Sequence, residues 1–378
     1  MMDKFDDLRP YEISEIPQAM QRIAESPYLP EMAKFVFPDK KIDEVRSLLL
    51  KIQTVDDFQF QVMYYFNKSV IDRSINQITC SGLEYLDPQK NYLFVSNHRD
   101  IVLDSSLMQY LFYLNGLRTT EITFGSNLMS SQLVIDIGKS NKMFKVIRGG
   151  SIRDFYKNSK HLSEYIRYTI TEKRESIWIA QRNGRTKNGN DATDQGIIKM
   201  FCMSGTNDIV ASLNELCIVP LAISYEVEPC DILKTKELYL SHGGKEYVKK
   251  EGEDFHSILT GITQYKGNVH FSVCEPLKHE ELDLIAKDFP NEFHKKVALL
   301  IDKRIYKNYK LHRNNYIAHD IRSKTENYST HYTAEEKERF LLRYKQMLEA
   351  IDGEESILAA IFLGIYANPV DKSMINAN

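Results

Sequence analysis

The sequence has 378 residues, of which 43% are hydrophobic and 27% are charged, a composition that is ordinary for a soluble globular protein with a full core. The formal net charge of -3 gives no reason to expect general nucleic-acid binding. The five cysteines are scattered and include no Cys-x-x-Cys pair. This pattern argues against a disulfide framework and a zinc site, and it fits a reducing cytoplasm.

The N-terminus, Met-Met-Asp-Lys-Phe-Asp-Asp, lacks the basic-then-apolar order of a signal peptide. No window reaches the roughly eighteen continuous apolar residues that a membrane-spanning helix needs. The nearest candidate, Ile357–Ala367, is more typical of a core or interfacial helix. If the protein works at a membrane, we expect it to sit on the surface.

A helical N-terminal subdomain is predicted over residues 1–75. Apolar residues recur there three and four positions apart, and prolines mark breaks between the helical stretches. The stretches are 17–25, 42–52 and 58–75.

From residue 77 the pattern changes to short apolar or β-branched runs that alternate with helical stretches. This alternation predicts an α/β fold with a mostly parallel central sheet flanked by helices. The predicted strands are 78–82, 92–96, 121–124, 144–147, 177–180, 216–224, 237–240 and 269–273. The predicted helices are 102–114, 131–139, 151–172, 194–203, 253–264, 279–310, 317–323, 334–351 and 356–366. We assign 76–310 to the α/β domain and 311–378 to a helical C-terminal extension.

A histidine, His98, stands at the carboxyl end of the strand predicted at 92–96, where parallel sheets bind their ligands. Asp104 follows in the first turn of the next predicted helix. A carboxylate in this place can hold the imidazole in one tautomer while its other nitrogen takes a proton. The alternative is a structural histidine beside a helix that Asp100 caps.

Two later strand ends carry cations among glycines. One predicted strand ends in Arg148 and is followed by two glycines, which let backbone approach a phosphate closely. The strand 177–180 opens into a loop that carries Arg182, Arg185 and Lys187. The spacing is not that of a Walker phosphate loop, and each segment alone also fits a solvated basic turn.

Four blocks in this order resemble those of the glycerolipid acyltransferases, most closely the bacterial glycerol-3-phosphate and dihydroxyacetone-phosphate acyltransferase branch. The resemblance covers roughly 78–226. The blocks are Asn97-His98-Arg99 with Asp104, Gly125-Ser-Asn-Leu128 through Arg148, Gln181 to Gly189, and Ile218-Val-Pro-Leu-Ala-Ile-Ser-Tyr-Glu226.

The resemblance implies that His98 is the catalytic general base and that Asp104 orients it. It also implies a substrate-binding set that holds the phosphorylated acceptor. That set is Arg148, Arg182, Asn183, Gly184, Arg185 and Lys187.

The first block departs from the family's pattern in its spacing. Five residues separate His98 from Asp104, whereas the family has four. The extra residue must be absorbed by a bulge or an irregular first turn if the two side chains are to meet. Asp100 is the competing partner, but it would need a sharp turn.

The third block lacks the family's glutamate. Asn183 takes its place in the register Asn183-Gly184-Arg185, and a register on Gln181 also lacks a carboxylate. An amide keeps the hydrogen-bonding shape without the charge, so the orientation of the acceptor can differ.

The resemblance implies transfer of a fatty acyl group from acyl carrier protein or a coenzyme A thioester to a hydroxyl of glycerol 3-phosphate or a related phosphorylated acceptor, in phospholipid biosynthesis. A 1-acylglycerol-3-phosphate (lysophospholipid) or amino-lipid acceptor is the alternative, as is a catalytically impaired lipid-binding relative. No metal and no cofactor besides the acyl donor are expected. We expect a cytoplasmic protein, peripheral at the inner face of the cell membrane, with 102–114 and 356–367 as candidate membrane contacts that also fit the core.

Overall fold

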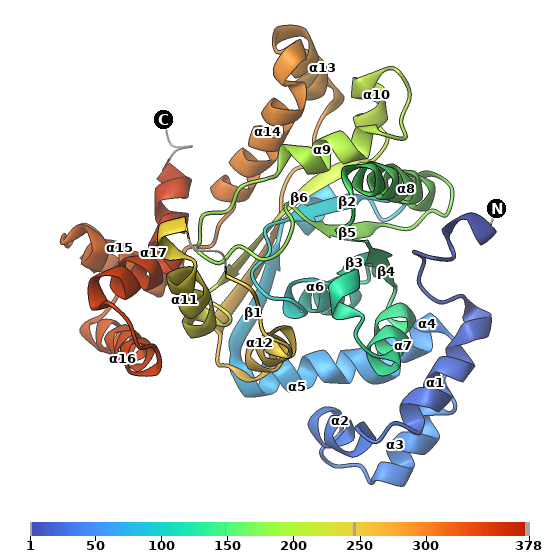
Figure 1. Ribbon diagram of the computed structural model, residues 1–378, viewed down its shortest axis with the longest axis horizontal. Coiled ribbons are helices and arrows are strands. Elements are labelled where there is room, and N and C mark those ends of the chain that lie inside the picture. The colour runs from blue at the N-terminus through green and yellow to red at the C-terminus, as the bar shows by residue number, and fades with distance from the viewer. Residues whose placement is uncertain (1, 148, 245–246, 375–378) are drawn as a thin grey trace.

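The computed structural model describes residues 2–147, 149–244 and 247–374. Within these residues a seven-stranded sheet runs through the centre of the molecule (Figure 1). The strands are β1 (Ile75–Ser81), β2 (Leu93–Ser96), β3 (Glu121–Gly125), β4 (Met143–Val146), β5 (Ile177–Ala180), β6 (Ile218–Tyr225) and β7 (Gly267–Val273).

The strands lie in the order β1-β7-β6-β2-β5-β3-β4. The run from β6 to β4 is parallel throughout. The strand β7 pairs with β6 in the antiparallel sense, and β1 pairs with β7 in the parallel sense. The predicted mostly parallel α/β sheet is therefore confirmed, with two strands at one edge that run the other way.

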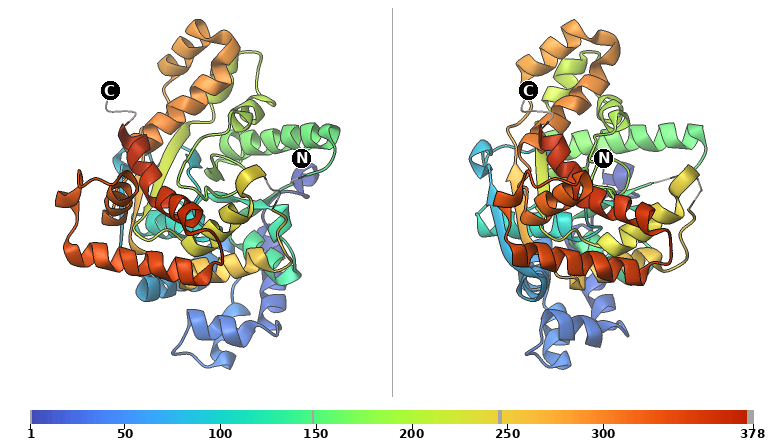
Figure 2. Two further views of the ribbon diagram at one scale, coloured as in Figure 1. Left: turned by 60° about the vertical axis from the view of Figure 1, so that its left-hand side comes forward. Right: turned by 90° about the vertical axis from the view of Figure 1, so that its left-hand side faces the viewer.

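Helices cover both faces of the sheet and form a group at each end of the chain (Figures 1 and 2). The N-terminal and first crossover α-helices are α1 (Ile16–Ala24), α2 (Leu29–Val36), α3 (Ile42–Leu49), α4 (Val55–Phe58), α5 (Tyr64–Ser74), α6 (Leu103–Leu114), α7 (Gln132–Ser140) and α8 (Ile152–Thr171). The remaining α-helices are α9 (Gln195–Cys202), α10 (Ile209–Asn214), α11 (Asp231–Leu240), α12 (Glu253–Thr263), α13 (His279–Asp288), α14 (Phe293–Lys307), α15 (Arg313–Ser323), α16 (Ala334–Ala350) and α17 (Glu355–Met374).

The strand β2 shows how the sheet divides the core. All of its residues are buried, and successive side chains point to opposite faces. Leu93 and Val95 pack into the cluster under α8, α9 and α14, whereas Phe94 packs into the cluster under α5 and α6. Burial on both faces explains why this strand reads as a continuous apolar run.

The two ends of the chain carry hydrophobic clusters of their own. The N-terminal cluster is formed by α1, α2, α3 and α4. Arg22 of α1 fixes it to helix α7 by donating to both carboxylate oxygens of Asp136 at 2.7 and 2.8 Å. The C-terminal cluster joins α15, α16 and α17.

Several predicted elements were wrong. Residues 237–240, predicted as a strand, are the end of α11, because Ile232 and Tyr239 pack on the C-terminal cluster with helical spacing. The segment predicted as one helix over 279–310 breaks into α13 and α14 around Pro290. The helix α2 was not predicted, since Pro30 was interpreted as a break although it occupies the first turn, where proline is tolerated.

Both candidate membrane segments are mostly buried, although Tyr113 and Leu114 at the end of α6 are exposed. Leu107 and Phe112 of α6 are buried against the sheet, and Leu358 and Phe362 of α17 are buried in the C-terminal cluster. Among the described residues, no helix combines the length and the apolar character needed to cross a membrane.

Candidate active site

The imidazole of His98 lies at the carboxyl end of β2, where the predicted partner reaches it. His98 Nδ1 is 2.8 Å from Asp104 Oδ2, which identifies Asp104 rather than Asp100 as the carboxylate in contact. The His98 side chain is 12% exposed and that of Asp104 is fully buried. The ring of Trp178 on β5 meets the imidazole edge-on at 5.6 Å between centroids.

The extra residue between His98 and Asp104 is absorbed before the helix begins. The chain from Arg99 to Val102 is irregular, and α6 starts only at residue 103. Asp104 Oδ2 accepts from the backbone N–H groups of Arg99 and Asp100 at 2.6 and 3.0 Å, which folds this turn around the carboxylate.

Asp104 is held as an anion. Burial alone would raise the pKa of Asp104, but the hydrogen bonds from His98 and from the backbone N–H groups hold that pKa below its ordinary value. The hydroxyl of Tyr225 on β6 donates to Asp104 Oδ1 at 2.8 Å, and burial together with this anion raises the pKa of Tyr225 well above its usual range. Because the carboxylate is ionised, the hydrogen of His98 sits on Nδ1 and leaves a lone pair on Nε2.

Asp100 has the capping role that was predicted as the alternative use of this turn. Its Oδ1 accepts from the N–H groups of Val102 and Leu103 at 2.9 and 2.8 Å, at the start of α6. Its Oδ2 packs against Gly261 of α12, where an added Cβ would lie 2.1 Å from that oxygen. The helix α12 therefore braces the turn that follows His98.

A buried set of charges fixes Arg99, the residue that follows His98. Arg99 pairs with Asp191 at 2.6 Å and with Glu228 at 3.3 Å. Lys234 bonds Glu228 at 2.6 Å and the Arg99 carbonyl at 2.7 Å. Burial alone would lower the pKa of Arg99, but the two carboxylates raise it well above its ordinary value. Such a set holds the backbone of the turn in one conformation.

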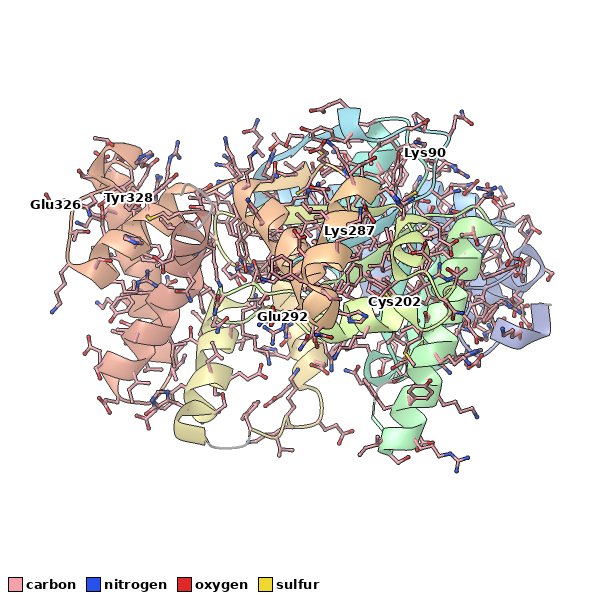
Figure 3. The ribbon with its side chains drawn as sticks, turned by 90° about the horizontal axis from the view of Figure 1, so that it is seen from above. Lys90, Cys202, Lys287, Glu292, Glu326 and Tyr328 are labelled. Atoms are coloured by element: carbon pink, nitrogen blue, oxygen red, sulfur yellow. The ribbon has the colours of Figure 1, made fainter. Side chains whose placement is uncertain are left out.

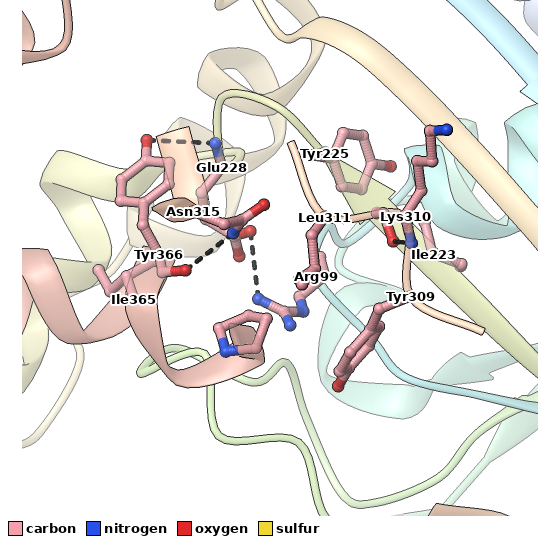
Figure 4. A pocket seen from close by; sticks show the side chains of 12 residues that line it. Arg99, Ile223, Tyr225, Glu228, Tyr309, Lys310, Leu311, Asn315, Ile365 and Tyr366 are labelled. Carbon is pink, nitrogen blue, oxygen red and sulfur yellow. Dashed lines mark hydrogen bonds and ion pairs between the residues drawn. The ribbon is translucent and has the colours of Figure 1, made fainter. Parts of the chain in front are cut away.

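Behind this set lies a small cavity of about 20 Å³ that Arg99, Tyr225 and Tyr309 help to line (Figure 4). In the same figure Asn315 bonds the carbonyl of Tyr366, which ties α15 to α17. The cavity has room for about one water molecule and is too small for a substrate. The residues that line this cavity therefore support the turn after His98 and do not form a substrate site.

In front of His98 lies the larger pocket, with a volume of about 340 Å³. Its lining contains both apolar side chains and cations. The apolar lining is Ile101, Phe124, Leu128, Trp178, Ala180 and Leu238. The polar lining that the sequence predicted is Arg182, Asn183, Gly184, Arg185 and Lys187, all from the loop after β5.

The cations of this loop differ in their surroundings. Lys187 is paired with Glu237 of α11, so part of its charge is already neutralised. Arg185 is half-buried, and its Nη1 has no hydrogen-bond partner among the described residues. Arg182 is exposed at the rim. Arg148, the remaining predicted phosphate ligand, lies outside the described residues.

Other groups at the site were missed from the sequence. Lys249 and Asp254 line the pocket and pair at 2.6 Å. Asp191 lies 92 positions from Arg99 along the chain, and only the parallel pairing of β2 with β5 brings the two together. No pattern of spacing signals such a contact, since it depends on tertiary structure. Within the described residues no group of His, Cys, Asp and Glu side chains could hold a metal ion.

Comparisons with known proteins agree with the site. Residues 77–224 match the family model described as Acyltransferase. This match assigns an acyltransferase domain to residues 77–224. Acyl transfer is therefore the chemistry that this segment, which contains His98 and Asp104, is expected to support.

No curated protein matches the sequence. Among solved structures, the chain is similar to PlsC, the 1-acyl-sn-glycerophosphate (LPA) acyltransferase from Thermotoga maritima. The identity is 11%, the match covers 76% of this chain and 94% of that one, and the TM-score is 0.37.

Proposed function

We propose that this enzyme transfers a fatty acyl group from an acyl carrier protein or coenzyme A thioester to a hydroxyl of glycerol 3-phosphate or a related phosphorylated acceptor, in phospholipid biosynthesis. The observation that carries the proposal is the His98–Asp104 pair at 2.8 Å, beside a pocket whose lining includes both cations and apolar side chains. The cations suit a phosphate, and the apolar side chains suit an acyl chain.

In this mechanism His98 Nε2 takes the proton of the acceptor hydroxyl as its oxygen attacks the thioester carbonyl carbon. The tetrahedral intermediate collapses by breaking the carbon–sulfur bond, and the imidazolium returns the proton to the departing thiolate. Asp104 stays ionised and stabilises the imidazolium. Such proton transfer is typically worth about 10²–10⁴-fold in rate.

The acceptor phosphate is held by Arg185, with Arg182 at the rim. Arg148, which lies outside the described residues, is kept as a third ligand on the sequence prediction alone. A guanidinium offers paired donors to a phosphate, which fixes the direction from which the hydroxyl approaches the histidine. Asn183 supplies a hydrogen-bonding amide where the family has a carboxylate, and Lys187 contributes less because Glu237 already engages it.

Backbone N–H groups of the loop around Gly184 are assigned to the oxyanion. The alternative, the start of α6, is less suited because Asp104 and Asp100 already accept from the N–H groups of the turn. Gly184 has a φ of 74°, and no atom lies within 4 Å of the position that a Cβ would take there, which leaves room for a reacting group.

A 1-acylglycerol-3-phosphate is the second candidate acceptor, because the apolar side chains of the lining also suit an acceptor that carries an acyl chain. An amino-lipid is the third candidate. A catalytically impaired relative is disfavoured by the intact His98–Asp104 contact. We also propose that the enzyme works in the cytoplasm, at the inner face of the cell membrane, because its product is a lipid.

The test is an assay of the purified protein with labelled acyl donors, both thioesters in turn, and a panel of these acceptors, read by thin-layer chromatography. We expect labelled monoacylglycerol phosphate from glycerol 3-phosphate. Product only from the lysophospholipid or only from an amino-lipid would replace the first acceptor with that one. No product with any pair would contradict the proposed activity.

A further inference from the structure

The first turn of α8 exposes large apolar side chains on one face. Ile152, Phe155 and Tyr156 are 92%, 65% and 63% exposed. Their positions i, i+3 and i+4 share one side of a helix, so they form a single ridge rather than scattered contacts. An exposed apolar ridge of this kind marks an interaction surface.

A second exposed apolar group lies at the start of α12 and just before it. Val248 is 76% exposed, and Phe255 and Leu259 are 62% and 45% exposed. Phe255 and Leu259 are four residues apart and so lie on one face of α12. The flanking Lys249 and Asp254 line the active-site pocket, so this group sits on the pocket wall.

The two groups face the same way. The amino-terminal end of α8 and the described residues between α11 and α12 both project to the right in the right-hand view of Figure 2, and both project downward in Figure 3. The helix α8 follows β4, whose neighbour β3 ends at Gly125 in the pocket wall. Both projections therefore rise from the edge of the sheet that carries the site.

Basic side chains flank the apolar ridge of α8. Arg153, Lys157 and Lys160 are exposed, and Asp154 is the only acidic residue among them in this stretch. Apolar side chains of this kind insert into the interfacial region of a bilayer, and cations beside them are attracted to anionic lipid headgroups. The exposed end of α8 therefore fits the surface of a bilayer that contains anionic lipid.

We propose that these two projections dock on an anionic bilayer surface and present the pocket to it. The proposal rests on the proposed function, since a lipid product has to leave the pocket for the membrane. An acidic protein partner would engage the cations of α8, but it would have to cover two separate apolar projections as well.

The test uses vesicles of phosphatidylcholine with and without phosphatidylglycerol, and measures the fraction of the full-length protein that sediments with them. In the tip variant Ile152, Phe155 and Tyr156 are all changed to Ser. The control variant carries Leu284→Ser and Leu342→Ser, which remove side chains of similar exposure, 59% and 58%, from α13 and α16. We expect the tip variant to partition roughly tenfold or more weakly than the wild type, and the control variant to partition like the wild type.

Binding is also expected to be stronger with phosphatidylglycerol and to weaken in salt. Equal partitioning of tip variant and wild type, or a wild type that does not bind vesicles, would overturn the proposal. So would a tip variant that loses affinity for acyl carrier protein while it keeps its affinity for vesicles.

Transfer of a short, water-soluble acyl group without vesicles separates this proposal from the proposed function. We expect the tip variant to retain that activity in full. A wild type that binds vesicles through the α8 ridge but transfers no acyl group would refute the function and leave the docking surface standing.

Discussion

The substitution Asp104→Asn removes the charge of the carboxylate that holds His98 and leaves its shape almost unchanged. Asp104 Oδ2 accepts from His98 Nδ1 at 2.8 Å and from two backbone N–H groups. An amide oxygen in that place keeps all three donors, and its NH₂ then faces the oxygen of Tyr225, which can accept. The tautomer of the histidine is therefore expected to survive.

What the variant loses is the attraction between a carboxylate and the imidazolium that forms during the reaction. Two unit charges 4 Å apart attract by about 4 kcal/mol at an effective dielectric constant of about 20. That energy corresponds to a factor of about 10³ in rate. Because the imidazolium is only partly formed in the transition state, the full factor is an upper limit. We therefore expect kcat to fall by about 10²–10³-fold, with little change in KM for either substrate.

The matched control is Asp100→Asn. Its amide oxygen can keep the two N–H donors at the start of α6, so kcat is expected to fall less than about tenfold. Both variants are assayed as purified proteins with the same acyl donor, after circular dichroism has verified the fold. A larger loss at Asp100 than at Asp104 would refute the assignment of the orienting carboxylate.

Three further predictions concern binding, packing and pH. In a steady-state assay, Arg185→Gln is expected to raise KM for the phosphorylated acceptor by about 10–100-fold without a change in KM for the donor. Lys187→Gln is expected to have a smaller effect on the same KM, because Lys187 is already paired with Glu237. Gly261→Ala places a Cβ 2.1 Å from Oδ2 of Asp100, in the turn after His98, and is expected to lower kcat by roughly tenfold. In the control Gly364→Ala the nearest atom to the added Cβ is 3.6 Å away. We expect this control to have normal kcat and a free energy of unfolding that is higher by up to about 1 kcal/mol. Burial raises the pKa of Asp302 from 3.8 to about 6, so this carboxyl favours the fold fully below pH 3.8 and that contribution is lost as the pH rises through 6. Asp302→Asn is therefore expected to raise the free energy of unfolding in urea by about 1–3 kcal/mol near pH 8 and to have little effect near pH 3; no gain near pH 8 would contradict this.

The alternation of strands and helices was readable from the sequence because buried parallel strands are short apolar runs. The prediction of secondary structure from this alternation was wrong where the local pattern fits both a strand and a helix. Leu238 and Leu240 alternate like a strand, yet the packing of α11 on the C-terminal cluster makes them helical. Pro30 looks like a break until its place in a first helical turn is known.

The His98–Asp104 contact could be proposed from the order of the sequence blocks. Which of Asp104 and Asp100 contacts His98 depended on how the chain absorbs one extra residue between His98 and Asp104. That choice is made by backbone hydrogen bonds to Asp104 and by Gly261, which is far away in sequence. The buried partner of Arg99, Asp191, depended on the pairing of strands and had no local signal.

The most direct test of the account is acyl transfer by purified His98→Ala, measured beside the wild type with labelled acyl donor and glycerol 3-phosphate. The His98 side chain is 12% exposed at the pocket, so its removal is expected to leave the circular dichroism spectrum and the thermal unfolding profile close to those of the wild type. We expect turnover to fall by at least about 10²-fold, to the background of the assay. A folded His98→Ala protein that transfers acyl groups at a rate near that of the wild type would contradict the central claim that this histidine is the general base.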